Sequence, residues 1–94
     1  MRITKQRRAF INAVKEKLEK FNTPKQLAIF YSKRYEIFEG CDSIIVPLVE
    51  VAISEFVKEK NWELEYGVNI ALLKVEGKLW VRAERKNISW FSMI

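Results

Sequence analysis

The sequence predicts an α+β domain, in which about three N-terminal helices pack on a C-terminal antiparallel β-meander of three to four strands. Up to about Lys60 the apolar residues recur every three to four positions, which is typical of amphipathic helices. From Trp62 onward they alternate with polar residues, which is the pattern of half-buried strands. A chain of 94 residues closes one core, so we expect a single small domain over 1–94, helical over about 4–60 and β over about 62–94.

The first predicted helix covers the segment from Thr4 to Phe21. Its apolar face repeats at the spacing of a helix and consists of Phe10, Ile11, Val14, Leu18 and Phe21. Polar and basic side chains fall on the opposite side, so this helix is expected to lie on the surface of the domain.

The second helix is predicted from Pro24 to Phe38, and its start has the strongest local signal in the chain. Thr23 can cap the helix, Pro24 suits the first helical position, and Gln26 lies where a capping box requires it. Gly40 is well placed to end this helix.

Pro47 determines where the third helix is expected to begin. A proline in the second turn would lack an amide hydrogen and crowd the carbonyl four residues back. We therefore expect the helix to run from Pro47 to about Lys60, with 43–46 extended before it. Asn61 is expected to close the helix in a left-handed conformation.

The β-region is predicted to fold by two turns, at Glu76-Gly77 and at Lys86-Asn87. The resulting register directs one apolar face of the sheet toward the helices. The outer face collects a mixed set of aromatic, aliphatic and basic side chains, namely Leu73, Trp80, Arg82, Phe91 and Met93.

This outer face resembles in composition the aromatic and arginine anchors of binding interfaces, so it is a candidate partner interface. Two alternatives stay open: a helix covers the face, or bases stack on Trp80 or Phe91. The interpretation depends on register, because a slip of one residue moves Trp80 and Arg82 to the core side.

Charge is segregated along the chain. Residues 1–34 carry ten Lys or Arg against two acids, whereas residues 35–65 carry two against eight. The last 29 residues are basic again, and the formal net charge is +5. A polyanion, an acidic partner or a second copy would therefore meet very different faces.

The basic first third favours contact with a phosphate backbone. The candidate nucleic-acid-binding residues are Arg2, Lys5, Arg7, Arg8, Lys15, Lys33 and Arg34. The competing interpretation is an ordinary solvated helix face with local pairs, as between Lys15 and Glu19. If nucleic acid binds, phosphate contacts predict little sequence preference.

The absence of histidine removes most catalytic chemistry. The chain contains neither a Ser-His nor a Cys-His pair nor a histidine ligand for zinc, and the lone Cys41 cannot build a thiolate site. Its isolated glycines offer no phosphate-cradling loop. We therefore expect no enzyme, no cofactor and no metal.

No apolar run approaches the roughly 18 residues of a membrane span, and the N-terminus lacks the core of a signal peptide. A single cysteine also fits a reducing interior. The sequence thus favours a cytoplasmic protein without a membrane partner.

Together these observations favour a non-enzymatic binding protein. The first interpretation is a small nucleic-acid-binding accessory or regulatory protein that contacts phosphates of DNA or RNA, with low specificity, through its basic N-terminal helices. The alternative is a protein-interaction module, an adaptor or an inhibitor. It would dock through the Trp80/Phe91 sheet face or the acidic middle segment, with self-association into a homo-oligomer as one variant.

Overall fold

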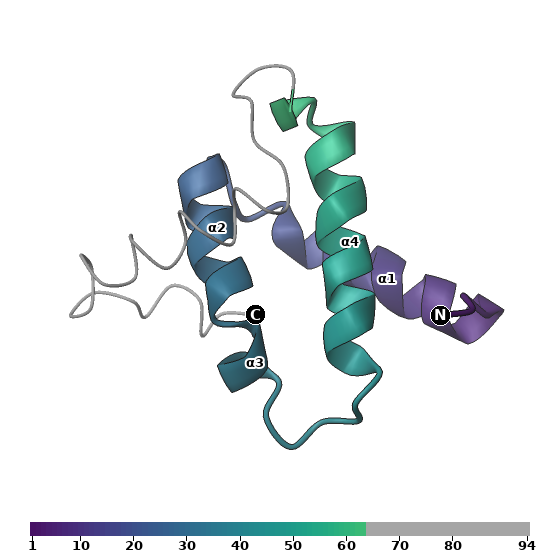
Figure 1. Ribbon diagram of the computed structural model, residues 1–94. Coiled ribbons are helices and arrows are strands. Elements are labelled where there is room, and N and C mark those ends of the chain that lie inside the picture. Colours follow the sequence, from purple (N-terminus) through teal and green to yellow (C-terminus); the bar gives the residue numbers. More distant parts are fainter. Residues whose placement is uncertain (64–94) are drawn as a thin grey trace.

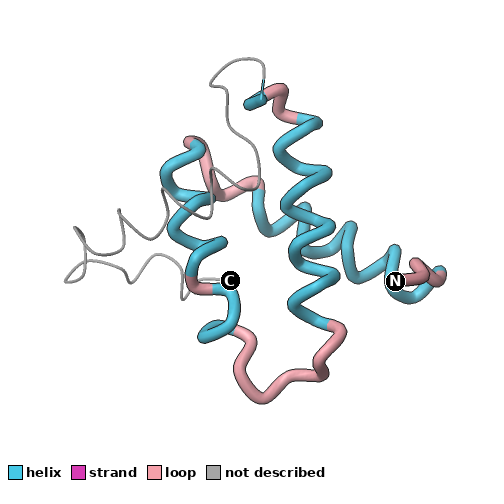
Figure 2. The backbone as a smooth tube through the Cα atoms, viewed as in Figure 1, coloured by secondary structure: helices cyan, strands magenta, loops and turns pink. Residues whose placement is uncertain are grey.

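The computed structural model describes residues 1–63, which form four helices. These are α1 (Lys5–Leu18), α2 (Pro24–Ser32), the short α3 (Arg34–Ile37) and α4 (Ile45–Glu59). In Figure 1, α4 crosses α1 steeply, and α2 runs in the direction opposite to α4. Figure 2 shows the loop that carries the chain from α3 back to the start of α4.

One apolar core joins the helices, and its buried members come from α1, α2, α4 and the segments that follow α1 and α4. They are Ile11, Val14, Leu18, Phe21, Leu27, Ala28, Phe30, Tyr31, Leu48, Val49, Ala52, Ile53, Phe56, Val57 and Trp62. Phe30 is fully buried, stacks on Phe21 at 5.5 Å between ring centroids, and meets the edge of Phe38 at 6.4 Å. Each such side chain contributes about 1.5–3 kcal/mol by leaving water.

The first helix forms where the sequence predicts it. Thr4 is its N-cap, and the hydroxyl accepts a hydrogen bond from the Arg7 amide at 3.2 Å. The helix ends at Leu18 rather than at Phe21, but Phe21 still packs into the core.

The predicted start of α2 is confirmed. The Thr23 hydroxyl accepts from the Gln26 amide at 3.4 Å, and Pro24 occupies the first turn. The Gln26 side chain reaches back one residue further than in a standard capping box, because its Oε1 accepts from the Asn22 amide at 2.9 Å.

The single helix expected from Pro24 to Phe38 is wrong, because the helix breaks at Lys33. Two side chains take the carbonyls that would continue it: the Ser32 hydroxyl donates to Ile29 O at 2.8 Å, and Arg34 Nη1 donates to Tyr31 O at 2.8 Å. Side-chain bonds of this kind compete with helical ones. The Lys33 amide accordingly donates to Phe30 O, three residues back.

A glycine follows the end of α3, as expected for the end of the helix predicted to reach Phe38. Gly40 has φ of +84°, in the left-handed region that residues with a side chain rarely adopt. The chain leaves α3 through this residue and enters the loop toward α4.

The expectation that the third helix begins at Pro47 is also wrong, since α4 begins at Ile45. Pro47 is the third residue of its first turn, where amides have no helical acceptor, so the missing N–H removes no bond. The first helical bond comes from the next residue, as the Leu48 amide donates to Ile44 O at 3.1 Å.

The expected extended conformation of residues 43–46 fails for a local reason. Asp42 accepts twice from the chain ahead of it: Oδ1 from the Ile44 amide at 3.1 Å, and the backbone carbonyl from the Ile45 amide at 3.0 Å. These two hydrogen bonds hold the segment in a turn that leads directly into α4.

Asn61 adopts the expected left-handed conformation, with φ of 57°. The residues after it contradict the predicted first strand, because Trp62 and Glu63 are helical. Trp62 is buried edge-on against Phe56, with ring centroids 5.4 Å apart. A buried aromatic beside an exposed acid fits a helix as well as a strand, so the alternation was misleading at this point.

The α+β fold class is therefore contradicted: the part of the chain that the structure describes is helical and contains no strand. The remaining strands and turns predicted for the β-meander lie beyond residue 63, outside the described residues.

We predict that Pro47→Ala changes the free energy of unfolding by less than about 1 kcal/mol, because Pro47 gives up no helical bond in the first turn. Ser54→Pro, in the interior of the same helix, is the matched comparison and should cost about 3 kcal/mol or more. Urea denaturation followed by circular dichroism measures both. A loss above about 2 kcal/mol for Pro47→Ala would contradict this placement of the helix start.

Candidate functional site

The polar side of α4 faces the basic helix α1. Arg8 Nη1 lies 2.8 Å from Oε1 and 3.0 Å from Oε2 of Glu55. Lys15 Nζ lies 3.2 Å from the same Oε1 and 2.5 Å from Glu59 Oε1. Glu55 and Glu59 are four residues apart, and Arg8 and Lys15 are seven apart, so each pair shares one face of its helix. The basic first third and the acidic middle of the chain therefore bind each other.

A further ion pair extends this contact with the signs reversed. Lys60 Nζ, after α4, lies 2.7 Å from Glu19 Oε2, after α1. We call the whole set, Arg8, Lys15, Glu19, Glu55, Glu59 and Lys60, the charged seam. It follows the crossing of α1 and α4 that Figure 1 shows.

The charged seam shifts the pKa values of two of its members, Glu55 and Lys15. The hydrogen bond from Arg8 is the main reason why the pKa of the Glu55 carboxyl lies below its ordinary value, and Lys15 adds to the effect. The hydrogen bond to Glu59 raises the pKa of Lys15, with a smaller contribution from Glu55. Burial opposes both shifts.

We predict that Glu55 makes stability depend on pH in the acid range. Its pKa is lowered in the folded chain, whereas the unfolded chain titrates at about 4.3, so its contribution is fully present above that pH and is lost as the pH falls from there through the lower pKa of the folded chain. At pH 7, Glu55→Gln should cost about 1 kcal/mol, and this difference from wild type should shrink on acidification.

Thermal unfolding from pH 7 to pH 3 checks this dependence on pH. Glu39→Gln, at an exposed site between α3 and α4, is the control and should show little difference at any pH. A destabilisation by Glu55→Gln that stays constant across the range would contradict the pairing.

Arg34 lies inside the protein, with only 4% of its surface exposed. Its guanidinium lies over the Tyr31 ring at 4.1 Å and over the Tyr35 ring at 4.5 Å, and Nη2 is 3.7 Å from Glu50 Oε2. Burial raises the pKa of the Tyr31 hydroxyl, which stays protonated and donates to Glu50 Oε2 at 3.4 Å. Arg34 thus joins α2 and α3 to α4.

The other predicted phosphate contacts differ in their surroundings. Lys33 Nζ lies 3.3 Å from Glu36 Oε2. Arg2, Lys5 and Arg7 form what we call the N-terminal basic cluster, and within residues 1–63 none of the three has a carboxylate partner. Arg7 Nη1 donates to the Arg2 carbonyl at 2.6 Å, which ties the arm before α1 to the helix.

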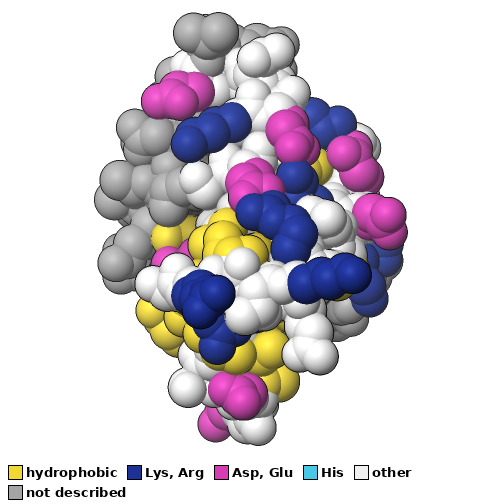
Figure 3. All heavy atoms as spheres, turned by 90° about the vertical axis from the view of Figure 1, so that its right-hand side faces the viewer, with side chains coloured by type: hydrophobic (Ala, Val, Ile, Leu, Met, Phe, Trp, Pro, Cys, Tyr) yellow, Lys and Arg dark blue, Asp and Glu magenta, His cyan; other side chains and the backbone are white. Residues whose placement is uncertain are grey.

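The N-terminal basic cluster lies at the N-terminal end of α1, where the helix dipole is unfavourable for cations. The first turn contains no acid, although the positive end of the helix dipole favours anions. Each exposed cation there costs about 0.3–1 kcal/mol at low ionic strength. Figure 3, which faces this side of the molecule, shows Lys and Arg side chains across its middle, with acidic side chains around them. An anion placed at this end would relieve the repulsion.

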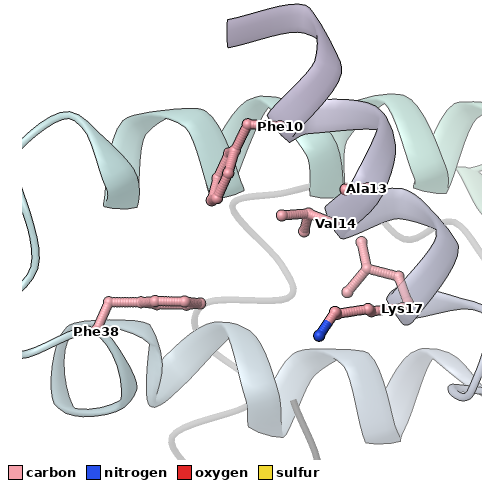
Figure 4. Close-up of a pocket in the computed structure, with 6 residues that line it drawn as sticks. Phe10, Ala13, Val14, Lys17 and Phe38 are labelled. Atoms are coloured by element: carbon pink, nitrogen blue, oxygen red, sulfur yellow. The ribbon is translucent and has the colours of Figure 1, made fainter. Parts of the chain in front are cut away.

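An apolar pocket of about 150 Å³ opens between α1 and the end of α3 (Figure 4). The described residues that line it are Phe10, Ala13, Val14, Lys17, Leu18 and Phe38. A cavity of about 150 Å³ is large enough for a benzene-sized group. The helical pattern of the sequence identified the α1 side of this pocket, but nothing local showed that Phe38 would lie opposite.

A second pocket, of about 350 Å³, lies between α3 and the start of α4. Its walls include the aromatic rings of Tyr35 and Phe38, the carboxylates of Asp42 and Glu50, and the exposed thiol of Cys41. Sequence reasoning missed this pocket, because it depends on how the loop after Gly40 returns to α4.

The candidate partner interface, Leu73, Trp80, Arg82, Phe91 and Met93, lies outside the described residues. Among residues 1–63, no three His, Cys, Asp or Glu side chains gather closely enough to hold a metal ion. In the same range no helix has the length and apolar character needed to cross a membrane.

Comparison of the chain with protein-family models, curated proteins and solved structures finds no match. The surface chemistry of the described residues is therefore the basis for a functional proposal.

Proposed function

We propose that this protein is a non-enzymatic nucleic-acid-binding protein, with an accessory or regulatory role, that contacts phosphates through the N-terminal basic cluster. One observation carries the proposal: Arg2, Lys5 and Arg7 crowd the positive end of α1 without a carboxylate partner in residues 1–63. A phosphate placed there would meet cationic donors and the positive end of the helix dipole together.

The phosphate-binding surface is smaller than the sequence suggested. Arg8 and Lys15 are held by acids of α4, and Arg34 is buried. Releasing Arg8 and Lys15 to a ligand would leave Glu55 and Glu59 without these partners, and releasing Arg34 would do the same to Glu50, so these three cations stabilise the fold.

The expected binding is weak and depends little on base sequence. Two arginines and a lysine can each pair with a phosphate oxygen, arginine through two parallel hydrogen bonds. Phosphate contacts position a protein on nucleic acid without reading bases. With about three contacts to a duplex, the slope of log K against log salt should be about −2 to −3.

The alternative function, a protein-interaction module, has its own support in the apolar pocket between Phe10 and Phe38. An apolar side chain of a partner would fit there. The acidic middle segment is less suited than the sequence suggested, because Glu55 and Glu59 are engaged by α1. Binding through this pocket should be nearly indifferent to salt, unlike phosphate contact.

We predict that Arg2→Gln with Lys5→Gln weakens binding to labelled DNA and RNA and lowers the magnitude of the salt slope by about 2, because two phosphate contacts are lost. Fluorescence anisotropy over a range of salt measures both quantities. The matched control is Lys25→Gln with Lys58→Gln, which removes the same charge from exposed positions elsewhere.

A stability measurement separates loss of binding from loss of folding. Since Arg2 and Lys5 lie at the positive end of α1, their neutralisation should leave Tm unchanged or raise it slightly. Equal weakening by the two double variants would show that only net charge matters. Absence of binding even at low salt would exclude the proposed function.

A further inference from the structure

The pocket between α3 and α4 has the chemistry to hold a basic side chain. We call it the acidic pocket and define it by Tyr35, Phe38, Asp42 and Glu50. Its volume, about 350 Å³, is at the lower end of pockets that take small ligands. No Lys or Arg occurs between residues 35 and 57, and Arg34, just before that segment, is paired with Glu50, which leaves Asp42 as the carboxylate for a second cation.

Two walls of the acidic pocket already hold a guanidinium. Arg34 lies over the Tyr35 ring at 4.5 Å, with Nη2 3.7 Å from Glu50 Oε2. An aromatic face beside a carboxylate favours such a group through cation–π and ionic attraction. Tyr35 nevertheless remains 63% exposed, so much of its surface is open to another cation.

The N-terminal arm, residues 1–5, has the complementary character. It alternates apolar and basic residues, Met1, Arg2, Ile3 and Lys5, around the cap Thr4. Met1 is 61% exposed and Ile3 is 39% exposed. With Tyr35, they are the large hydrophobic residues that stay exposed within residues 1–63. The exposed apolar groups thus lie in two patches of opposite charge.

These two patches lie on different sides of the molecule. In Figures 1 and 2 the N-terminus lies beyond α4 from α3, at the far end of α1. The arm of one copy therefore lies away from its own acidic pocket, and the pocket of a second copy is open to it.

We propose that copies of this chain associate head to tail, with the N-terminal arm of one copy docked in the acidic pocket of the next. The contact is heterologous, so each complex keeps one free arm and one free pocket, and further copies can add to form open chains or a ring. This inference goes beyond the proposed function and does not depend on it.

Sedimentation equilibrium without nucleic acid tests the proposal. The mean mass of the wild-type protein should rise with concentration beyond a dimer. It should fall toward the monomer in about 1 M salt, where the screening length is about 3 Å. Wild-type protein that stays monomeric at every concentration, or that stops at a dimer, would overturn it.

Two double variants make the test specific. Arg2→Glu with Lys5→Glu reverses the charge of the arm and keeps the pocket, whereas Tyr35→Ala with Asp42→Asn weakens the pocket and keeps the arm. Asparagine at this position keeps a side-chain oxygen that can accept from the Ile44 amide, as Asp42 does. Each variant alone should be monomeric, since each has lost one half of the contact.

Mixing the two variants provides the decisive result. One intact pocket then meets one intact arm, so the mixture should form a 1:1 dimer and nothing larger. This dimer also shows that the variant with the intact pocket is folded. Circular dichroism of each variant gives an independent measure of folding. A mixture of folded variants that stays monomeric would overturn the head-to-tail contact.

Discussion

Glu55 is the point at which the basic first third of the chain meets the acidic helix α4, because its carboxylate accepts from both Arg8 and Lys15. The two helices it joins form the most extensive helix contact in residues 1–63. Apolar burial supplies most of the stability there, at about 1.5–3 kcal/mol for each core side chain, against about 0.2–1 kcal/mol for each exposed ion pair. The charged seam therefore contributes mainly by selecting which faces of α1 and α4 meet.

This internal neutralisation changes what the charge segregation of the sequence means for function. A strongly basic third and an acidic middle suggest two large and opposite binding surfaces, but the charged seam pairs Arg8 and Lys15 of the first with Glu55 and Glu59 of the second. The two proposals therefore use other places: the N-terminal basic cluster and the acidic pocket. Because the arm belongs to the proposed phosphate site and to the proposed contact between copies, nucleic acid and a second copy would compete for it.

The sequence predicted best the features that nearest neighbours determine. Thr23, Pro24 and Gln26 start α2 as expected, and Asn61 turns the chain out of α4, since capping and left-handed geometry depend on a few adjacent residues. The break at Lys33 was missed because side chains, rather than backbone preferences, take the carbonyls of that turn.

Longer-range features were beyond sequence reasoning. The competing interpretation of the basic face pairs Lys15 with Glu19 four residues on, yet Lys15 meets Glu55 and Glu59, forty or more residues away. Spacing within one helix cannot indicate such a partner. The β-prediction failed at its first step for a related reason: Trp62 packs on Phe56 of the preceding helix, and this tertiary contact outweighs the alternation of the sequence.

The most direct test of the central claim, that the chain neutralises its own charge across α1 and α4, is a double-mutant cycle on Arg8 and Glu55. The free energy of unfolding is measured for Arg8→Ala, Glu55→Ala and the double variant, at low and at high salt. The pairing predicts a coupling energy of about 0.5–1 kcal/mol at low salt that falls toward zero as salt screens it. Strict additivity at low salt would contradict the claim, and would return Arg8 to the set of cations that are open to a partner.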